Sequence, residues 1–258
     1  MKAYKNSAFL DSPDARALRI LSEFVEPKAR FARAGIEDTI VFMGSARIPA
    51  PDASETASDA VERGSRDALS DSTLAYQACR ELARRLTVWS KSLPEGQRRF
   101  VVCSGGGPGI MEAANRGASE GGGINVGLGI SLPHEQHNNP YITRELSLEF
   151  HYFFMRKFWF AYMAKAIVFF PGGFGTLDEL FEVLTLVQTG KIKKHLPIVL
   201  FDSTFWHETI NFTALVERGM ISKTDLDLFL LTDSVDEAFS HLTTQLIRYG
   251  VKEHGARL

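Results

Sequence analysis

Residues 166–180 read AIVFFPGGFGTLDEL. The first five are apolar and typical of a buried strand, and Leu177, Leu180 and Leu184 then follow at helical spacing. A proline and three glycines therefore stand between a strand and the first turn of a helix. Glycine lets a backbone approach a ligand closely, and a helix N-terminus offers unpaired N–H groups with a positive dipole end. The stretch predicts an anion site at the end of a strand.

Two more apolar runs end in the same way. The run at 39–43 is followed by Gly44-Ser45-Ala46-Arg47, and the run at 100–103 by Ser104-Gly105-Gly106-Gly107-Pro108-Gly109. Because open α/β sheets bind ligands beyond the carboxyl ends of their strands, the three turns together predict a phosphate-binding crevice. The glycines match neither a Walker A motif nor a GxGxxG fingerprint with its ribose-binding acid. A nucleoside monophosphate is therefore favoured over NAD or ATP.

Strands and helices alternate along the whole chain. We expect strands at 39–43, 100–103, 124–130, 166–170 and 197–201, a short strand or turn at 148–154, and helices at 74–89, 110–118, 156–165, 204–218 and 234–249. The apolar runs are continuous rather than alternating, which indicates strands buried on both faces. The fold class is therefore α/β, with a doubly wound, mostly parallel, Rossmann-like sheet.

The first 35 residues predict an N-terminal helical arm. Ser12-Pro13-Asp14 is a good helix start, and Pro27 is expected to end or kink that helix. Residues 36–258 are expected to form a single Rossmann-like nucleotide-binding domain. Within it, residues 49–72 have few large apolar side chains and are expected to form an exposed connection.

Composition limits the classes of partner. The chain has 258 residues, 45% hydrophobic and 23% charged, and 29 basic against 31 acidic side chains give a net charge of 29 − 31 = −2. This balance favours neither a nucleic-acid polymer nor an anionic membrane. Cys79 and Cys103 lie in apolar segments and are expected to be buried free thiols. The first residues lack a signal-peptide pattern, so a cytoplasmic location is expected.

Three segments carry a family resemblance. SGGGPGIMEAANRGA at 104–118, Met155-Arg156-Lys157, and PGGFGTLDELFE at 171–182 resemble the LONELY GUY (LOG) family, whose signature is PGGxGTxxE. The resemblance covers roughly residues 38–202 and implies hydrolysis of a nucleoside 5′-monophosphate, a cytokinin riboside 5′-monophosphate or an AMP-like one, to free base and ribose 5-phosphate. It implies no cofactor, and a homodimer or a higher homo-oligomer. Many such sequences carry the description "lysine decarboxylase", but no motif here supplies a Schiff-base lysine for pyridoxal phosphate.

The resemblance assigns catalysis to Glu179 and Arg156. Breaking an N-glycosidic bond passes through a sugar cation, so it needs a carboxylate near the anomeric carbon and help for the departing base. Glu179 is expected to face the ribose and water, while Arg156 orients the nucleotide. An alternative is structural, because Thr176 and Glu179 have the spacing of a capping box, which would fold the carboxylate back onto the helix start.

The expected binding residues lie on the turns and beside the catalytic pair. They are Gly172, Gly173, Gly175, Thr176, Ser45, Ser104, Gly105, Gly106, Gly107, Lys157 and Glu182. Arg156 and Lys157 lie among aromatic side chains, where a charge needs a partner or a pocket edge. The alternative for both is a solvated pair on a helix. Glu182 lies one turn beyond Glu179 and is either a ribose contact or a surface acid.

The polar stretch SLPHEQHNNPYIT at 131–143 is expected to be a loop that closes over the nucleotide. His134 and His137 have no third ligand close in sequence, so no metal site is expected. The aromatic residues of 150–162 are expected in the core or at a subunit interface. A nucleotide or molybdenum-cofactor carrier of the same fold is the alternative to an enzyme. A nucleotide-sensing regulator is a third possibility, although no effector domain supports it.

Overall fold

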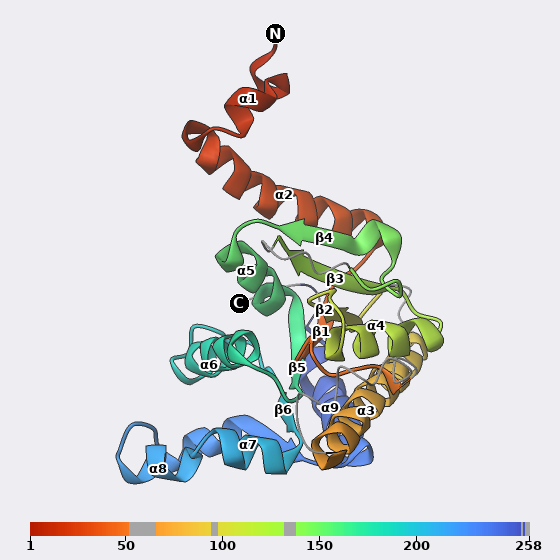
Figure 1. Ribbon diagram of the computed structural model, residues 1–258, viewed down its shortest axis with the longest axis vertical. Coiled ribbons are helices and arrows are strands. Elements are labelled where there is room, and N and C mark those ends of the chain that lie inside the picture. The colour runs from red at the N-terminus through yellow and green to blue at the C-terminus, as the bar shows by residue number, and fades with distance from the viewer. Residues whose placement is uncertain (52–65, 94–97, 132–137, 254, 256–258) are drawn as a thin grey trace.

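The computed structural model describes residues 1–51, 66–93, 98–131, 138–253 and 255 (Figure 1). Two regions predicted from the sequence, the connection at 49–72 and the loop at 131–143, therefore lie partly outside the described residues. His134 and His137 belong to that undescribed part.

Seven parallel strands form one sheet in the order β4-β3-β2-β1-β5-β6-β7. In chain order they are β1 (Thr39–Met43), β2 (Val101–Ser104), β3 (Asn125–Ile130), β4 (Ser147–Phe150), β5 (Ala164–Phe169), β6 (Ile198–Phe201) and β7 (Phe229–Thr232). The doubly wound α/β class predicted from the sequence is confirmed. The strand order reverses between β1 and β5, which makes the space above their carboxyl ends the ligand crevice of such folds.

Helices cover both faces of the sheet (Figure 1). One face packs against α3 (Arg66–Lys91), α4 (Ile110–Glu120) and α9 (Val235–Gln245). The other face packs against α5 (Phe153–Met163), α6 (Phe174–Gln188) and the arm helix α2 (Arg16–Ala34). The described residues also form three short α-helices, α1 (Ser7–Leu10), α7 (Ser203–Thr209) and α8 (Phe212–Glu217). Short 3-10 helices lie at Ala3–Lys5, Pro13–Ala15, Arg144–Leu146 and Lys223–Leu228, and a π-helix lies at Leu246–Gly250.

The arm helix continues through Pro27, so of the two predicted effects of this proline, a stop or a kink, the stop does not occur. Proline lacks an N–H, which frees the carbonyl four residues earlier, at Glu23. The indole Nε1–H of Trp159 on α5 donates to that carbonyl at 2.9 Å. The Glu23 carboxylate in turn accepts from the N–H groups of His151 and Tyr152, at 2.7 and 3.2 Å. The arm therefore holds the residues that lead into α5, the helix that carries Arg156 and Lys157.

Several predicted boundaries shifted. Strand β5 begins at Ala164, so Lys165 lies in a strand rather than at a helix end, and α3 already begins at Arg66. The helix expected over 204–218 is two helices, because the Asn211 side chain accepts from Ala214 N–H at 2.9 Å and starts a new one. Strand β7 was not predicted. Only four residues long, it lies at the edge of the sheet.

The two cysteines are buried free thiols, as predicted, and burial raises the pKa of each. In the described parts of the chain, no helix combines the length and the apolar content that crossing a membrane requires.

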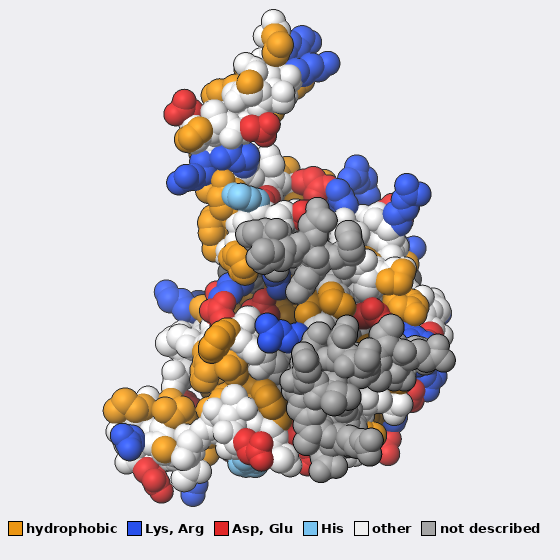
Figure 2. All heavy atoms as spheres, viewed as in Figure 1, with side chains coloured by type: hydrophobic (Ala, Val, Ile, Leu, Met, Phe, Trp, Pro, Cys, Tyr) orange, Lys and Arg blue, Asp and Glu red, His pale blue; other side chains and the backbone are white. Residues whose placement is uncertain are grey.

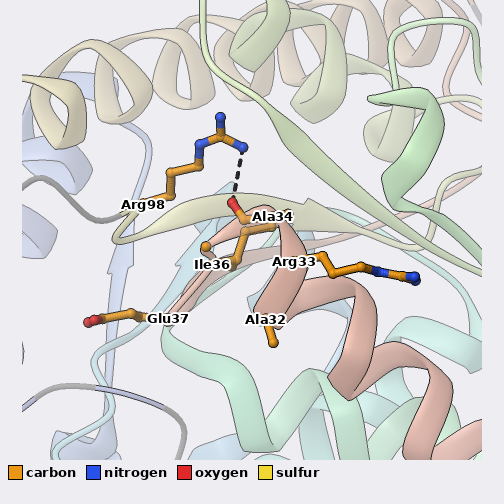
Figure 3. A pocket seen from close by; sticks show the side chains of 7 residues that line it. Ala32, Arg33, Ala34, Ile36, Glu37 and Arg98 are labelled. Atoms are coloured by element: carbon orange, nitrogen blue, oxygen red, sulfur yellow. Dashed lines mark hydrogen bonds between the residues drawn. The ribbon is translucent and has the colours of Figure 1, made fainter.

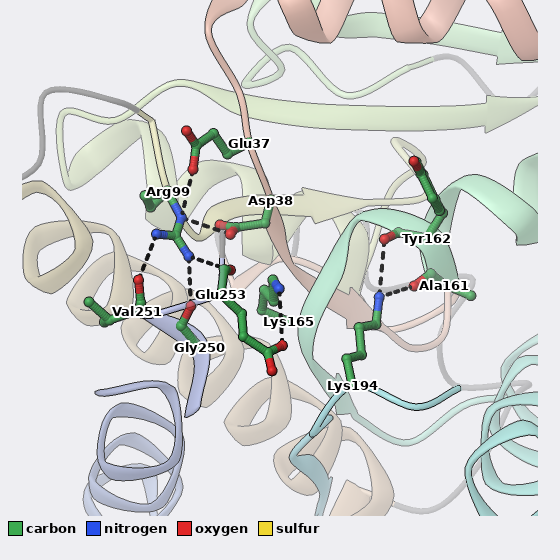
Figure 4. Close-up of polar contacts among 10 residues, drawn as sticks. All are labelled: Glu37, Asp38, Arg99, Ala161, Tyr162, Lys165, Lys194, Gly250, Val251 and Glu253. Carbon is green, nitrogen blue, oxygen red and sulfur yellow. Dashed lines mark hydrogen bonds and ion pairs between the residues drawn. The ribbon is translucent and has the colours of Figure 1, made fainter. Parts of the chain in front are cut away.

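A buried cluster of charges lies at the amino ends of the central strands (Figure 4). Arg99 pairs with Asp38 at 2.7 Å, and its guanidinium also donates to the carbonyl oxygens of Gly250, Val251 and Glu253. Burial raises the pKa of Asp38 despite the arginine. The cluster therefore holds the C-terminal segment against the amino ends of the strands, whereas the glycine turns lie at the carboxyl ends.

Candidate functional site

The three glycine turns meet above the central strands. The N–H of Ser45 donates to the Pro171 carbonyl at 2.9 Å, and the first N–H of α4, at Ile110, donates to the Ser45 carbonyl at 3.0 Å. A Cβ at Gly109, whose φ is +70°, would lie 2.3 Å from that same carbonyl oxygen. Glycine is therefore required where the turns after β1 and β2 touch, and the turn after β5 lies beside them.

The start of α6 is open to a ligand. Its N-cap is Gly173, and no described side chain caps the helix. A Cβ at Gly172 would lie 2.1 Å from Thr176 Oγ1, whereas a Cβ at Gly173 or Gly175 would meet nothing within 4 Å. Gly172 is thus needed for the packing of buried Thr176, while the other two glycines keep the N-terminus uncovered. Backbone N–H groups in this position suit a phosphate.

The predicted capping box between Thr176 and Glu179 does not form. The helix begins at Phe174, so Thr176 lies inside the first turn rather than at the N-cap. The Glu179 carboxylate instead accepts a hydrogen bond from Arg156 Nη2 at 3.1 Å. The structure therefore brings the two predicted catalytic residues together across α5 and α6.

The pair is largely shielded from water. The side chains of Arg156 and Glu179 are 12% and 13% exposed. The Arg156 Nε is buried and has no hydrogen-bond partner among the described residues, so it keeps a donor for a ligand. The guanidinium also lies over the Phe160 ring, 5.2 Å from its centroid, and Nη2 lies 3.4 Å from where a Cβ would stand on Gly105. Arg156 thus connects the acid on α6 with the turn after β2.

Burial raises the pKa of Glu179 to about 6, although the positive charges of Arg156 and Lys157 oppose the shift. Asp178 and Glu182 raise it further as neighbouring acids. A carboxyl with a pKa close to neutrality can accept and release a proton during turnover.

Lys157 forms a second ion pair between the same helices. Its Nζ lies 2.6 Å from Asp178 Oδ2 and 2.9 Å from Glu182 Oε2. Burial lowers the pKa of Lys157, but these two hydrogen bonds outweigh it and the pKa is raised. The structure therefore pairs the two predicted binding residues Lys157 and Glu182 with each other, beside the Arg156–Glu179 pair.

The turn after β2 rests on buried amides that the sequence did not indicate. The Ser104 hydroxyl is buried, donates to Asn115 Oδ1 at 2.6 Å and accepts from Gly106 N–H at 3.1 Å. Asn139 Nδ2 meets the carbonyl oxygens of Gly106 and Gly107 at 3.1 and 3.0 Å. Ser104 thus shapes the turn from below. Asn115 and Asn139 lie within predicted segments, but nothing in their local sequence marks their contact with the turn.

A hollow of about 990 Å³ adjoins the crevice. Its lining includes Ser45 and Gly172 of the turns, Leu74 and Ala78 of α3, and Phe205 of α7. It has room for part of a small ligand. A second hollow, of about 540 Å³, lies around Gly35 near the amino end of β1 (Figure 3). None of the predicted site residues lines it.

Exposed phenylalanines lie on α5 and α6. Phe174 is 93% exposed, and Phe153, Phe154 and Phe181 are also exposed. The arm presents further apolar side chains on its outer face, at Leu18, Leu21 and Val25 among others. Figure 2 shows these apolar areas along the arm and around α6. Among the described residues, no group of three or more His, Cys, Asp or Glu side chains is placed to hold a metal.

The sequence matches a known family over its central and C-terminal parts. The family model described as "Possible lysine decarboxylase" matches residues 111–242, slightly more than half of the chain. Relatives of the same family include cytokinin riboside 5′-monophosphate phosphoribohydrolases. The chain belongs to the LOG family.

The relatives from the LOG family are distant. A probable cytokinin riboside 5′-monophosphate phosphoribohydrolase of Oryza sativa subsp. japonica is 28% identical over 145 residues, 55% of this chain and 62% of its own length. A cytokinin riboside 5′-monophosphate phosphoribohydrolase of Arabidopsis thaliana is 27% identical over 145 residues, with 55% and 66% covered. The chain therefore spans slightly less than two thirds of each of these relatives.

Solved structures with a related chain path include the molybdenum cofactor carrier protein of Chlamydomonas reinhardtii. The similarity covers 82% of this chain and 99% of that one, at 17% identity and a TM-score of 0.49. It is too distant to bear on function.

Proposed function

We propose that the protein hydrolyses the N-glycosidic bond of a nucleoside 5′-monophosphate, such as a cytokinin riboside 5′-monophosphate or AMP, to free base and ribose 5-phosphate. The observation that carries the proposal is the buried Arg156–Glu179 pair, held between two helices beside the open N-terminus of α6. Membership of the LOG family and the named activity of its distant relatives agree with it.

Each residue then has a role set by its surroundings. The open first turn of α6, at Gly173 and Gly175, holds the 5′-phosphate through backbone N–H groups. The Glu179 carboxylate faces the anomeric carbon, where it stabilises the sugar cation and takes a proton from the attacking water. The C1′–N bond breaks, the water oxygen bonds to C1′, and the proton that Glu179 took from the water passes to the departing base, which restores the carboxylate. Arg156 orients the nucleotide and stabilises charge on the departing base, since a guanidinium keeps its proton at neutral pH.

Lys157 and Glu182 support the pair from the side in this proposal. The ion pairs of Lys157 with Glu182 and with Asp178 fix the distance between α5 and α6, and so the direction in which Glu179 points. Ser45 and the glycines of the turn after β2 line the same crevice.

We also propose that the protein acts as a homodimer. The exposed phenylalanines around α6, with Phe174 the most exposed, form an apolar surface beside the site that a second copy would cover. Light scattering coupled to size-exclusion chromatography tests this, with Phe174→Ser expected to shift the mass towards the monomer. An unchanged mass with both proteins monomeric would contradict it.

The experiment that tests the activity distinguishes hydrolysis of a nucleotide from binding without cleavage. Purified protein is incubated with AMP, GMP, CMP, UMP and isopentenyladenosine monophosphate, and free base and ribose 5-phosphate are measured by chromatography. Binding of the same nucleotides is measured by calorimetry. Base release from at least one nucleotide, in equal amount with ribose 5-phosphate, is the expected result. Binding without release from any of them would contradict the proposal and favour a carrier.

A further inference from the structure

One backbone donor beside the site has no partner. Gly107 is buried, and in the part of the chain that the structure describes no acceptor meets its N–H. Buried N–H groups are almost always paired with protein or water, so an unpaired one at a ligand crevice indicates a place for an acceptor on the ligand.

Asn139 fixes the peptide that carries this donor. The Gly106 carbonyl accepts two hydrogen bonds from Asn139, from its backbone N–H at 2.8 Å and from Nδ2 at 3.1 Å. The peptide between Gly106 and Gly107 is trans and planar, so its C=O and N–H point in opposite directions. Holding the Gly106 oxygen against Asn139 therefore turns the Gly107 N–H away from Asn139.

The Asn139 side chain is itself held in place. Its Nδ2 also meets Asn115 Oδ1 at 2.9 Å, and its Oδ1 accepts from Tyr141 N–H at 3.2 Å. Asn115 Nδ2 in turn donates to Asn125 Oδ1 at 2.9 Å. Ser104, Asn115, Asn125 and Asn139 are all buried, and their bonds form one connected network. A buried network with satisfied members fixes one conformation strongly.

The segment from 138 to 143 also fits the turn by shape. A Cβ at Gly106, whose φ is +77°, would lie 3.2 Å from Ile142 Cδ1, and a Cβ at Gly127 on β3 would lie 2.5 Å from the same atom. The two glycines therefore admit Ile142 between the turn and the sheet. This contact keeps Asn139 beneath the turn.

We infer that Asn139 is a positioning residue for the ligand site: it holds the Gly106–Gly107 peptide so that the Gly107 N–H is presented to an acceptor oxygen or nitrogen of the bound nucleotide. The inference rests on the proposed function for the identity of the ligand. It concerns binding alone, so it is tested separately from hydrolysis.

The test compares Asn139→Asp with wild type. The substitution keeps the size of the side chain and the acceptor for Tyr141, but it turns a carboxylate oxygen towards the Gly106 and Gly107 carbonyls. We expect the dissociation constant of AMP to rise by at least about 10-fold, the worth of one hydrogen bond to a nucleotide group. Asn138→Ala is the matched control, because the exposed Asn138 donates to Ser147 Oγ instead of to the turn, and it should bind AMP like wild type.

Stability is measured alongside to separate positioning from folding. Asn139→Ala, which keeps the backbone bond to Gly106, should also bind AMP more weakly while remaining folded. A folded Asn139 variant with a lower melting temperature but the wild-type dissociation constant would overturn the inference. If neither variant folds, Ser104→Ala removes the acceptor of the Gly106 N–H and is judged by the same criterion.

Wild-type behaviour distinguishes the two proposals. A wild type that binds AMP without releasing adenine contradicts the hydrolase, while the Asn139 comparison is still decided by the dissociation constants. A wild type that does not bind any nucleotide of the panel overturns both.

Discussion

The charge of Glu179 depends on a balance between burial and its neighbours. Burial disfavours the carboxylate, and Arg156 and Lys157 favour it, so that the pKa is about 6. In the proposed reaction the ionised form is the active one, because it stabilises a cation and accepts a proton. A residue of this kind changes its charge just below neutral pH.

The pH dependence of the reaction should follow this carboxyl. The value of kcat/KM is expected to be constant above a pH of about 7 and to fall tenfold per pH unit below about 6, as Glu179 becomes protonated. Lys157→Met removes a positive charge that lowers the pKa of Glu179 and should move the falling limb to higher pH. Lys157→Arg keeps the charge and serves as the control. A rate that rises on acidification would indicate instead that the protonated form acts as an acid.

At the scale of single residues, the sequence indicated Arg156 and Glu179 but not the contacts that surround them. Glu179 and Arg156 were predicted through the PGGxGTxxE resemblance, and the structure brings them within 3.1 Å. The local spacing of Thr176 and Glu179 suggested a cap, which was wrong because the helix starts three residues earlier than a cap at Thr176 requires. Asn139 was missed because its partners Gly106 and Asn115 are far away in sequence.

At the scale of elements, Gly172 and Gly175 at the start of α6 have different structural roles. Gly172→Ala places a Cβ where Thr176 Oγ1 lies, so it should lower the free energy of unfolding by about 1–3 kcal/mol, as overpacking does. Gly175→Ala meets open space in a helix, where alanine is favoured over glycine by about 1 kcal/mol. It should keep or raise stability but weaken AMP binding. Urea unfolding and calorimetry measure the two effects. Wild-type binding by a folded Gly175→Ala protein would place the phosphate elsewhere.

The junction between the arm and α5 predicts a non-additive pair of substitutions. Trp159→Phe removes the donor to the Glu23 carbonyl, and an unpaired buried carbonyl costs about 1–3 kcal/mol in addition to the lost packing. Pro27→Ala restores the helical N–H that would pair with this carbonyl. The double variant should therefore be more stable than the sum of the single changes predicts, by about 1 kcal/mol. Additive unfolding free energies would show that Trp159 does not replace the missing N–H.

The same junction shows why some elements could be predicted and others could not. The central strands were found from their continuous apolar runs, and the arm helix from its start signal at Ser12-Pro13-Asp14. Proline at position 27 is a local signal for a break, yet a tertiary partner satisfies the carbonyl it frees, so the helix continues. The edge strand β7, FLLT, was missed.

At the scale of the whole molecule, the glycine turns and the buried charge cluster of Arg99 and Asp38 lie at opposite ends of the strands. The glycine turns lie at the carboxyl ends of the strands, while Arg99 and Asp38 tie the C-terminal segment at the amino ends (Figure 4). The position of the glycine turns was predictable from the topology, because parallel strands bring their carboxyl ends to the same side of the sheet. The buried charges could not be predicted, because nothing in the local sequence indicates that Asp38 and Arg99 face each other.

Loss of Arg99 should destabilise the fold without touching the site. Arg99→Met leaves the fully buried Asp38 without its ion-pair partner, and breaking a buried pair costs about 3–5 kcal/mol. Arg99→Met combined with Asp38→Leu should recover part of this loss, because the fully buried carboxylate of Asp38 is then removed together with its partner. Chemical denaturation gives the free energies. Equal stability of wild type and Arg99→Met would contradict this account of the cluster.

The most direct test of the central claim is the rate of ribose 5-phosphate formation from the best nucleotide of the panel, for wild type, Glu179→Gln and Glu182→Gln. The two variants make the same change one helical turn apart, and only Glu179 contacts Arg156. We predict that Glu179→Gln binds the nucleotide but loses about 10²–10⁴-fold in kcat, the usual contribution of a catalytic acid or base. Glu182→Gln should stay within about 10-fold of wild type, the effect of a supporting contact of about 1.4 kcal/mol. A folded Glu179→Gln protein that forms ribose 5-phosphate at the wild-type rate would contradict the claim that this carboxylate carries out the chemistry.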